Sequence, residues 1–281
     1  MDAVAVKGKI QRLSNLPGLA VVKYQLIKTL NKESASINDI SDIIRHDQAI
    51  ASRVLAVANS AFLGFPGRID SIEQAVMLLG FDLVRSISLA ASIFNVFASQ
   101  YGNFKQMWAH SYIVANIASR ICDKTAAGER SACFLAGLLH DIGRLTLFKI
   151  ASDSGMDGEV QALLNLKGDD LLRAEAGVFK CHHTDAAKWF LENLCFPEDI
   201  IVSVGAHHGI ISGGPNAKIS NVIFLAESLS DVVSPQIVHD GQWSDKHQLL
   251  FQDIGLGNAD IEDIKALVAA EQSGIAQFFD L

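Results

Sequence analysis

The stretch that most constrains this fold runs from residue 134 to 148 and reads FLAGLLHDIGRLTLF. Its apolar side chains fall on every face of a helix, which is typical of a helix buried in a protein interior. The stretch also contains His140 and Asp141, which are costly to bury without partners. Neighbours at i and i+1 on a helix do not face each other. If residues 131–150 form one helix, both side chains therefore need partners from elsewhere.

Composition favours a single compact all-α unit. The chain has 281 residues and is 49% hydrophobic, which is enough for a sizeable core. Apolar residues recur with helical spacing, no convincing period-2 strand appears, and there are only 5 prolines. The expected helices span residues 19–30, 36–47, 48–62, 71–94 with an end or bend at Gly80, 104–125, 131–150, 159–167, 169–177, 181–194, 198–208, 216–232 and, in a looser tail, 260–271.

Charge and location follow from the same sequence. The formal net charge is −8 and only 19% of residues are charged, which argues against bulk nucleic-acid binding. The first residues, MDAVAVKGKI, lack the apolar core of a signal peptide, and residues 86–105 fit a core helix better than a membrane span. We therefore expect a cytoplasmic protein that does not enter a membrane. Its cysteines are expected to be buried free thiols, namely Cys122, Cys133, Cys181 and Cys195.

Local signals indicate several helix ends. Ser71, followed three residues later by Gln74, is a capping-box signature. Asp47 is well placed as an N-cap. Asn59 and Ser60 precede a loop and are expected to satisfy backbone groups there, or to line a surface for a partner.

The histidines are not spread evenly. His110 is alone in an amphipathic segment, and on its own it fits a satisfied core or boundary residue. Two adjacent pairs follow, His182–His183 and His207–His208. The second pair could simply interact with a helix C-terminus. Together with Asp141 and a later carboxylate, however, the histidines form a set suited to zinc, iron, manganese or magnesium. No HExxH motif is present, so the ligands would come from several helices.

This pattern resembles a known family. The order His110, His140-Asp141, His183, His207-His208 and Glu227 is similar to the HD superfamily of metal-dependent phosphohydrolases. The first half resembles one branch, the HDOD family of bacterial signalling-output domains. The matching stretches are LPGL at 16–19, IIRHDQAIASRVLAVANSAF at 43–62, and SIEQAVMLLGFDLVRSISL at 71–89.

The resemblance implies an all-α HDOD domain over residues 10–232, with an N-terminal helical lobe over about 10–100 and an HD-like lobe over about 101–232. Residues 233–281 would form a partly helical extension. The resemblance also implies one divalent ion, or two bridged by Asp141. The first ion would be held by His110, His140, Asp141 and Glu227, and the second by His183, His207 and His208. Glu227 stands where the family usually has Asp, and no GYP motif follows, so cyclic-dinucleotide cleavage is not implied.

Two functions remain open at this point. The first is a signalling module with a protein partner, in which the metal site is structural or regulatory. The second is a metal-dependent phosphohydrolase acting on a nucleotide or phosphate ester, with Asp141 and Arg144 as catalytic residues. Arg144 could contact a phosphate bidentately, or it could form an ion pair with Glu175 or Asp185.

Overall fold

The computed structural model describes residues 1–19, 44, 48–59, 69–97, 104–211, 213–214, 217–232 and 245–279. These residues form helices and no strand, which confirms the all-α class. The expected helices at 19–30 and 36–47, together with Asp47 and Ser60, lie almost entirely outside the described residues.

The helices are α1 (Ala3–Leu13), α4 (Gln48–Ala58), α5 (Ile72–Leu79), α6 (Phe81–Phe97), α7 (Phe104–Thr125), α8 (Arg130–Leu139), α9 (Ile142–Ser152), α10 (Asp157–Leu163), α11 (Gly168–Phe179), α12 (His183–Asn193), α13 (Glu198–Gly205), α14 (Ala217–Val232), α15 (Asp245–Ile254) and α16 (Asn258–Phe279).

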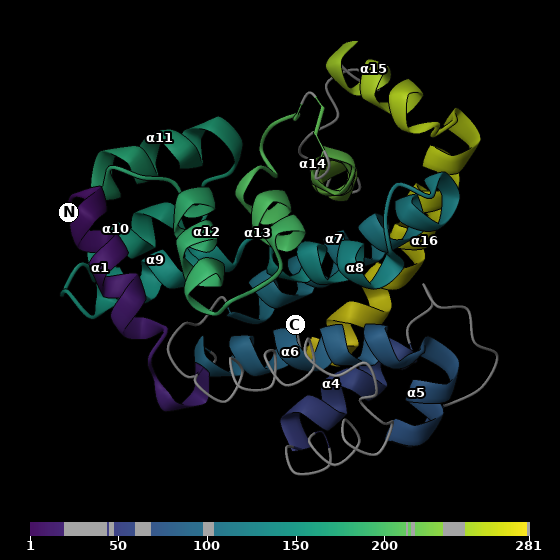
Figure 1. The fold of residues 1–281 in the computed structure, drawn as a ribbon, viewed down its shortest axis with the longest axis horizontal. Helices are drawn as coiled ribbons and strands as arrows, with labels where there is room; N and C mark the ends of the chain where they lie inside the picture. The colour runs from purple at the N-terminus through teal and green to yellow at the C-terminus, as the bar shows by residue number, and fades with distance from the viewer. Residues whose placement is uncertain are drawn as a thin grey trace.

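Helices α7 and α8 form the centre of the molecule (Figure 1). Helix α14 packs against both, α13 packs against α8 and α14, and α6 lies against the other side of α8. Helix α12 packs on α9, and the N-terminal α1 covers this pair. The arrangement brings helices that are far apart in sequence around the junction between α8 and α9.

The structure confirms several of the expected helix ends. The Ser71 hydroxyl accepts the Gln74 backbone N–H at 3.2 Å, while the Gln74 side-chain oxygen accepts the Asp70 backbone N–H at 3.1 Å. Gly80 ends α5 with φ of +83°, which glycine adopts without a Cβ penalty. The Asn59 side chain bonds both backbone groups of Ile69, as well as the Leu55 carbonyl.

The predicted single helix over 131–150 is wrong. Helix α8 ends at Leu139 and α9 begins at Ile142, and the backbone leaves helical geometry at Asp141, whose φ is −95° and ψ is 9°. The tail also differs from the expected short helix, because α15 and the long α16 both form. Helix α16 packs along α7, where Lys124 pairs with Asp260 at 2.8 Å and with Asp263 at 3.1 Å.

The cysteine prediction is only partly correct. Cys122 and Cys133 form a disulfide between α7 and α8, with their Cα atoms 6.8 Å apart. A sequence separation of eleven residues does not indicate this pair. The two cysteines meet because the turn between α7 and α8 brings the helices side by side. Cys181 is a buried thiol as expected, whereas the thiol-bearing Cys195 is exposed.

One helical stretch, Arg130–Ser152, is long and apolar enough to cross a membrane by composition alone, but 83% of its most apolar window is buried inside the protein. The expected core helix is also found: α6 buries most of its residues between 83 and 97. Both stretches therefore serve as core packing.

Candidate metal centre

The break between α8 and α9 places His140 and Asp141 in the interior with both side chains directed toward other helices. His140 is fully buried and Asp141 is 7% exposed. The break also corrects the argument from helix geometry, because His140 Nε2 lies 3.8 Å from Asp141 Oδ2. The two neighbours therefore face a common point.

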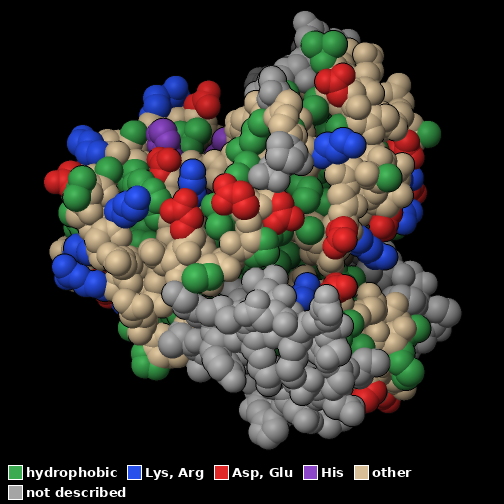
Figure 2. Space-filling model, viewed as in Figure 1, with side chains coloured by type: hydrophobic (Ala, Val, Ile, Leu, Met, Phe, Trp, Pro, Cys, Tyr) green, Lys and Arg blue, Asp and Glu red, His purple; other side chains and the backbone are tan. Residues whose placement is uncertain are grey.

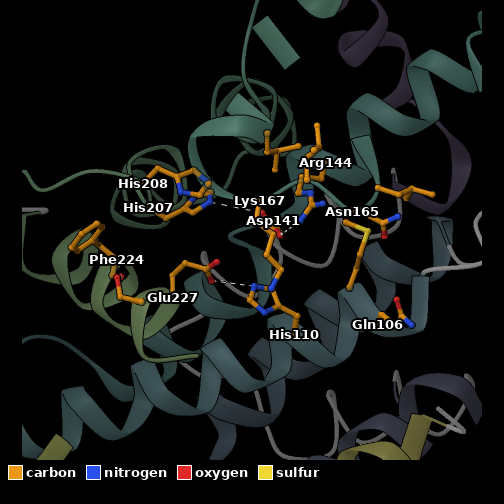
Figure 3. A pocket seen from close by; sticks show the side chains of 16 residues that line it. Gln106, His110, Asp141, Arg144, Asn165, Lys167, His207, His208, Phe224 and Glu227 are labelled. Atoms are coloured by element: carbon orange, nitrogen blue, oxygen red, sulfur yellow. Dashed lines mark hydrogen bonds and ion pairs between the residues drawn. The ribbon is translucent and has the colours of Figure 1, made fainter. Parts of the chain in front are cut away.

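Four side chains form what we call the carboxylate cluster. Glu227 from α14 places Oε2 at 3.1 Å from His110 Nε2 on α7 and at 3.3 Å from His140 Nε2. Figure 3 shows Glu227 and His110 facing each other across the cavity floor. The carboxylate cluster consists of His110, His140, Asp141 and Glu227.

Three imidazoles form what we call the imidazole cluster, which consists of His183, His207 and His208. His183 begins α12, and the other two follow the end of α13. The Nε2 atom of His183 lies 2.9 Å from that of His208 and 3.3 Å from that of His207. Their side chains come from two helix ends that converge on the α8–α9 junction.

Asp141 lies between the two clusters. Its Oδ1 is 3.5 Å from His183 Nε2 and 3.8 Å from His207 Nε2, while Oδ2 faces His140 and is 3.2 Å from Arg144 Nη1. The ion-pair partner of Arg144 is therefore Asp141, and neither Glu175 nor Asp185 takes that role. Glu175 instead contacts His183, and Asp185 accepts the His182 backbone N–H.

The outer nitrogens of three ligands are held in place by hydrogen bonds. Nδ1 of His140 donates to the Gly137 carbonyl at 2.8 Å, and Nδ1 of His207 donates to the Val204 carbonyl at 2.7 Å. Nδ1 of His183 lies 2.8 Å from Glu175 Oε2. In the neutral form of each ring, these bonds leave Nε2 with a lone pair directed into the centre.

Two glycines allow the helices to approach closely enough to build this centre. A Cβ on Gly137 would lie 2.5 Å from Ala115 Cα, so only glycine lets α8 pack this tightly on α7. A Cβ on Gly143 would lie 1.8 Å from the His183 carbonyl oxygen, where α9 meets α12. Gly137 serves the carboxylate cluster, and Gly143 brings Asp141 to the imidazole cluster.

The carboxylate cluster favours charged side chains. Burial lowers the pKa of His140, but the Asp141 and Glu227 charges outweigh it and raise the pKa to about 9. Burial raises the pKa of Glu227, yet the charges of His110 and His140 hold it well below its ordinary value. Burial likewise opposes ionisation of Asp141, and Arg144 with the nearby imidazoles outweighs it to keep that pKa low. Without metal, a protonated His140 therefore faces the carboxylates of Asp141 and Glu227.

Two members of the imidazole cluster, His207 and His208, favour the neutral ring. Burial, followed by repulsion from neighbouring imidazoles, lowers the pKa of His207 well below its ordinary value. The same two causes lower the pKa of His208 to about 4. His208 Nε2 can donate to the His183 Nε2 lone pair at 2.9 Å, and a divalent ion in place of that proton would use the lone pairs of all three rings.

The donor set fits divalent metal ions. Within each cluster the candidate atoms of His183, His207 and His208, and of His110, His140 and Asp141, lie within 4.8 Å of one another. His140 Nε2 and Glu227 Oε2 are buried without a well-formed hydrogen bond. Imidazole and carboxylate donors suit zinc, iron or manganese, and carboxylates suit magnesium.

A cavity of about 620 Å³ opens above both clusters. Figure 3 shows Phe224 on one side and Gln106 and Asn165 on the other, with Arg144 near Asp141. Lys167, which precedes the first turn of α11, also lines the cavity. The cavity therefore joins the candidate ligands to cationic, amide and apolar side chains.

Sequence reasoning placed all seven candidate ligands in one centre, and the structure brings them together. It missed the cavity residues Gln106, Asn165 and Lys167, which carry no motif. It also assigned no role to His247, whose ring stacks on Phe224 with centroids 5.2 Å apart. The role of Glu175 was missed because its partner, His183, is eight residues away on the next helix.

Comparison with known proteins matches residues 16–210 to the HDOD domain, which is more than half of the chain. The chain belongs to the HDOD family. Six of the candidate ligands of this HDOD domain lie inside the matched range, whereas Glu227 lies beyond it on α14. The structure brings Glu227 to His110 and His140, which lie inside the matched range.

Solved structures share this HDOD fold. A Geobacter sulfurreducens HDOD domain protein of unknown function is 24% identical, with a TM-score of 0.65 and coverage of 92% of this chain and 89% of its own. A Shewanella amazonensis protein described as a candidate phosphohydrolase is 18% identical, with a TM-score of 0.73 and coverage of 99% and 98%. A candidate signal transduction protein from Marinobacter aquaeolei is 19% identical, with a TM-score of 0.70 and coverage of 92% and 59%.

Curated relatives are longer than this chain. An uncharacterized Treponema pallidum protein is 23% identical over 219 residues, which span 76% of this chain and 42% of the relative. Bacillus subtilis YuxH is 26% identical over 150 residues, which span 52% and 37%. The chain thus spans less than half the length of either relative.

Proposed function

We propose that this HDOD domain is a cytoplasmic signalling module whose HD-like lobe is organised around a divalent metal centre. The observation that carries the proposal is the convergence of the His183, His207 and His208 Nε2 atoms at 2.9–3.3 Å. A proton on His208 Nε2 can bridge one of these contacts as a hydrogen bond to His183, whereas a metal ion would use the lone pairs of all three imidazoles.

In this proposal, His110, His140, Asp141 and Glu227 hold one ion, and the imidazole cluster holds a second, with Asp141 between them. The positions 3.5 and 3.8 Å from Asp141 Oδ1 to the imidazoles support the bridging role. The metal would fix the ends of α8, α12 and α13 relative to α7 and α14. A surface organised by these helices would then meet a protein partner.

The partner and the location are part of the proposal. The Marinobacter neighbour's description as a candidate signal transduction protein supports a signalling role. On the face shown in Figure 2, the described acidic and basic side chains are interspersed, which favours a protein partner over nucleic acid.

The test is the metal content of protein purified without chelator, followed by reconstitution with iron, manganese, zinc or magnesium. We expect His183→Ala to remove at least one equivalent of metal. His182→Ala is the matched control, because this adjacent imidazole is outside both clusters and 43% exposed. Wild-type protein that neither contains nor binds metal would refute the proposal.

A second candidate function is a metal-dependent phosphohydrolase, and the cavity favours it. Arg144 and Lys167 line the cavity beside the ligands, so a phosphate group above the clusters would meet two cationic side chains. The apolar wall of Met107, Leu164 and Phe224 could receive the organic part of a nucleotide or phosphate ester. A bound metal would supply an acidified water and stabilise phosphoryl charge.

In this second candidate, Asp141 orients the Arg144 guanidinium through the 3.2 Å ion pair. Arg144 would bind the phosphoryl oxygens, and Asp141 would be the carboxylate nearest the reacting group. The test compares hydrolysis of p-nitrophenyl phosphate, its bis ester, nucleotides and cyclic dinucleotides by the metal-loaded wild type and by the His140→Ala, Asp141→Ala double variant. Equal rates in both proteins would exclude this function and leave the signalling module.

A further inference from the structure

We infer that Glu175 is a positioning residue of the metal centre, which sets the tautomer and orientation of His183 so that Nε2 faces the ion. This inference rests on the proposed metal site and adds a residue outside its ligand set. Glu175 lies on α11 and His183 begins α12, so the contact joins two helices across the turn that connects them.

The geometry at Glu175 is closely defined. Its Oε2 atom lies 2.9 Å from the His183 backbone nitrogen and 2.8 Å from His183 Nδ1. Both residues are 0% exposed. One carboxylate oxygen therefore holds both the backbone and the ring of the same histidine, which fixes the direction of the ring.

The tautomer follows from the chemistry of the acceptor. An ionised carboxylate offers only lone pairs, so Nδ1 of His183 carries a proton and a neutral ring leaves Nε2 unprotonated. That Nε2 is the atom 2.9 Å from His208 and 3.5 Å from Asp141. With the other tautomer, a hydrogen would occupy the space where the ion is expected.

Glu175 differs from the groups that orient the other ligands. His140 and His207 are held by the neutral backbone carbonyls of Gly137 and Val204. A carboxylate raises the basicity of a ligating histidine more strongly than a neutral acceptor, and such partners typically change metal affinity by about 10- to 100-fold. His183 is thus set apart from the ligands held by neutral carbonyls.

A second observation argues against a purely structural role. Glu175 Oε1 is buried without a hydrogen-bond partner, which is unfavourable for a charged group. A cation at Nε2 of His183 would lie across the ring from Glu175 and compensate that charge. Glu175 is therefore expected to cost stability without metal and to favour metal binding, whereas a structural carboxylate would stabilise the fold with or without metal.

The experiment uses the full chain and Zn²⁺ as the probe. Glu175→Gln keeps the side-chain shape and an oxygen that can accept both bonds from His183, but it removes the charge behind the ring. We expect Zn²⁺ affinity to fall about 10- to 100-fold, while the melting temperature of the metal-free protein stays equal to or rises above that of the wild type. Glu175→Asp should recover part of the affinity, because it restores the carboxylate.

One further readout and one control variant make the result specific. Nitrogen-15 NMR of the metal-free protein should show a protonated Nδ1 on His183 in the wild type and a changed Nδ1 signal in Glu175→Gln. Asp170→Asn is the matched control, because it removes a carboxylate from the same helix where Asp170 and its partner Arg173 are both 73% exposed. This control should leave Zn²⁺ affinity within about twofold, since exposed ion pairs contribute little.

The outcomes separate this inference from the proposed function. If the wild type binds no Zn²⁺, the proposed metal centre fails, and the NMR signal of His183 still decides whether Glu175 sets the tautomer. An unprotonated Nδ1 in the wild type would overturn the inference. So would a folded Glu175→Gln protein with wild-type Zn²⁺ affinity. If Glu175→Gln does not fold, the wild-type tautomer and the Glu175→Asp affinity decide the question.

Discussion

The two clusters use similar side chains but reach opposite electrostatic states without metal. In the carboxylate cluster, Asp141 and Glu227 raise the pKa of His140 to about 9, so a proton occupies the position that an ion would take. In the imidazole cluster, burial and then repulsion from His183 lower the pKa of His208 to about 4, so its ring carries no added proton near pH 7. Metal binding at the first cluster therefore replaces an added proton, whereas His207 and His208 in the second have none to lose.

Ligand identity alone therefore does not set whether metal binding at a cluster must displace a proton. Metal binding at the carboxylate cluster must displace a proton from His140. At the imidazole cluster His207 and His208 are already neutral near pH 7, because their pKa values are lowered. The following changes would break or sharpen the contrast, and they run from the largest expected effect to the smallest.

Removing Asp141 should affect both clusters, because its two oxygens face different ones. A metal present at about 1,000 times its Kd stabilises a folded protein by about 4 kcal/mol, and Asp141→Ala should lose most of that gain. The metal-free protein should lose less. Urea unfolding with and without metal measures both losses, and Asp153→Ala at an exposed ion pair is the control. A larger loss in the metal-free protein would show that protein partners hold Asp141.

Metal affinity at the carboxylate cluster should rise with pH. Because the raised pKa of His140 is about 9, binding between pH 6.5 and 9 should release about one proton and gain about tenfold per pH unit. Isothermal titration of His183→Ala in buffers of different ionisation enthalpy isolates this cluster. Affinity independent of pH in that range would contradict the assigned proton.

The unfolding free energy of the metal-free protein should also depend on the His140 proton. It should fall as pH rises, whereas metal affinity at this cluster should increase. The pKa of His140 is raised on folding, so its contribution is fully present below about pH 6.5 and is lost as pH rises toward 9. The lowered pKa of His208 contributes stability above about pH 6.5 that is lost as pH falls toward 4. Urea unfolding across pH should separate these windows, with His140→Ala removing the alkaline loss and His208→Ala reducing the acidic one, to which the lowered pKa of His207 also contributes.

Neutralising Glu227 should reduce the contrast between the clusters. Glu227→Gln removes one of the two charges that raise the pKa of His140, so that pKa should fall toward 6.5. The pH dependence of metal binding at this cluster should flatten accordingly. NMR titration of His140 measures the shift, and Glu192→Gln on the surface of α12 provides a control of equal charge. An unchanged pKa would show that Asp141 alone is responsible.

The two close-approach glycines should affect different clusters, with a smaller effect. Gly137→Ala forces α8 away from α7 and should weaken the carboxylate cluster, while Gly143→Ala meets the His183 carbonyl and should weaken the imidazole cluster. Each is expected to cost about 3 kcal/mol in unfolding free energy, the upper end of the range for overpacked sites, because the added Cβ meets backbone atoms. Gly177→Ala on α11 meets open space and should not destabilise the protein. Equal effects of both variants on both clusters would mean that the centre behaves as one unit.

Much of the fold could be predicted from local patterns. The helix at 104–125 matches α7, and the expected ends at Ser71 and Gly80 match α5, because capping and glycine chemistry act within a few residues. The helix break at His140 was missed because apolar residues continue on both sides of it. Packing against other helices, rather than local sequence, separates α8 from α9.

The sequence by itself determined which residue types are available and which positions are buried in helices, since these depend on composition and periodicity. The tertiary structure decided which side chains meet. It brought Glu227 to His110 and His140 from more than 80 residues away. It also paired Arg144 with Asp141 and brought the Glu175 carboxylate to Nδ1 of His183. Such contacts depend on how helices cross and approach, and no short stretch of sequence encodes that geometry.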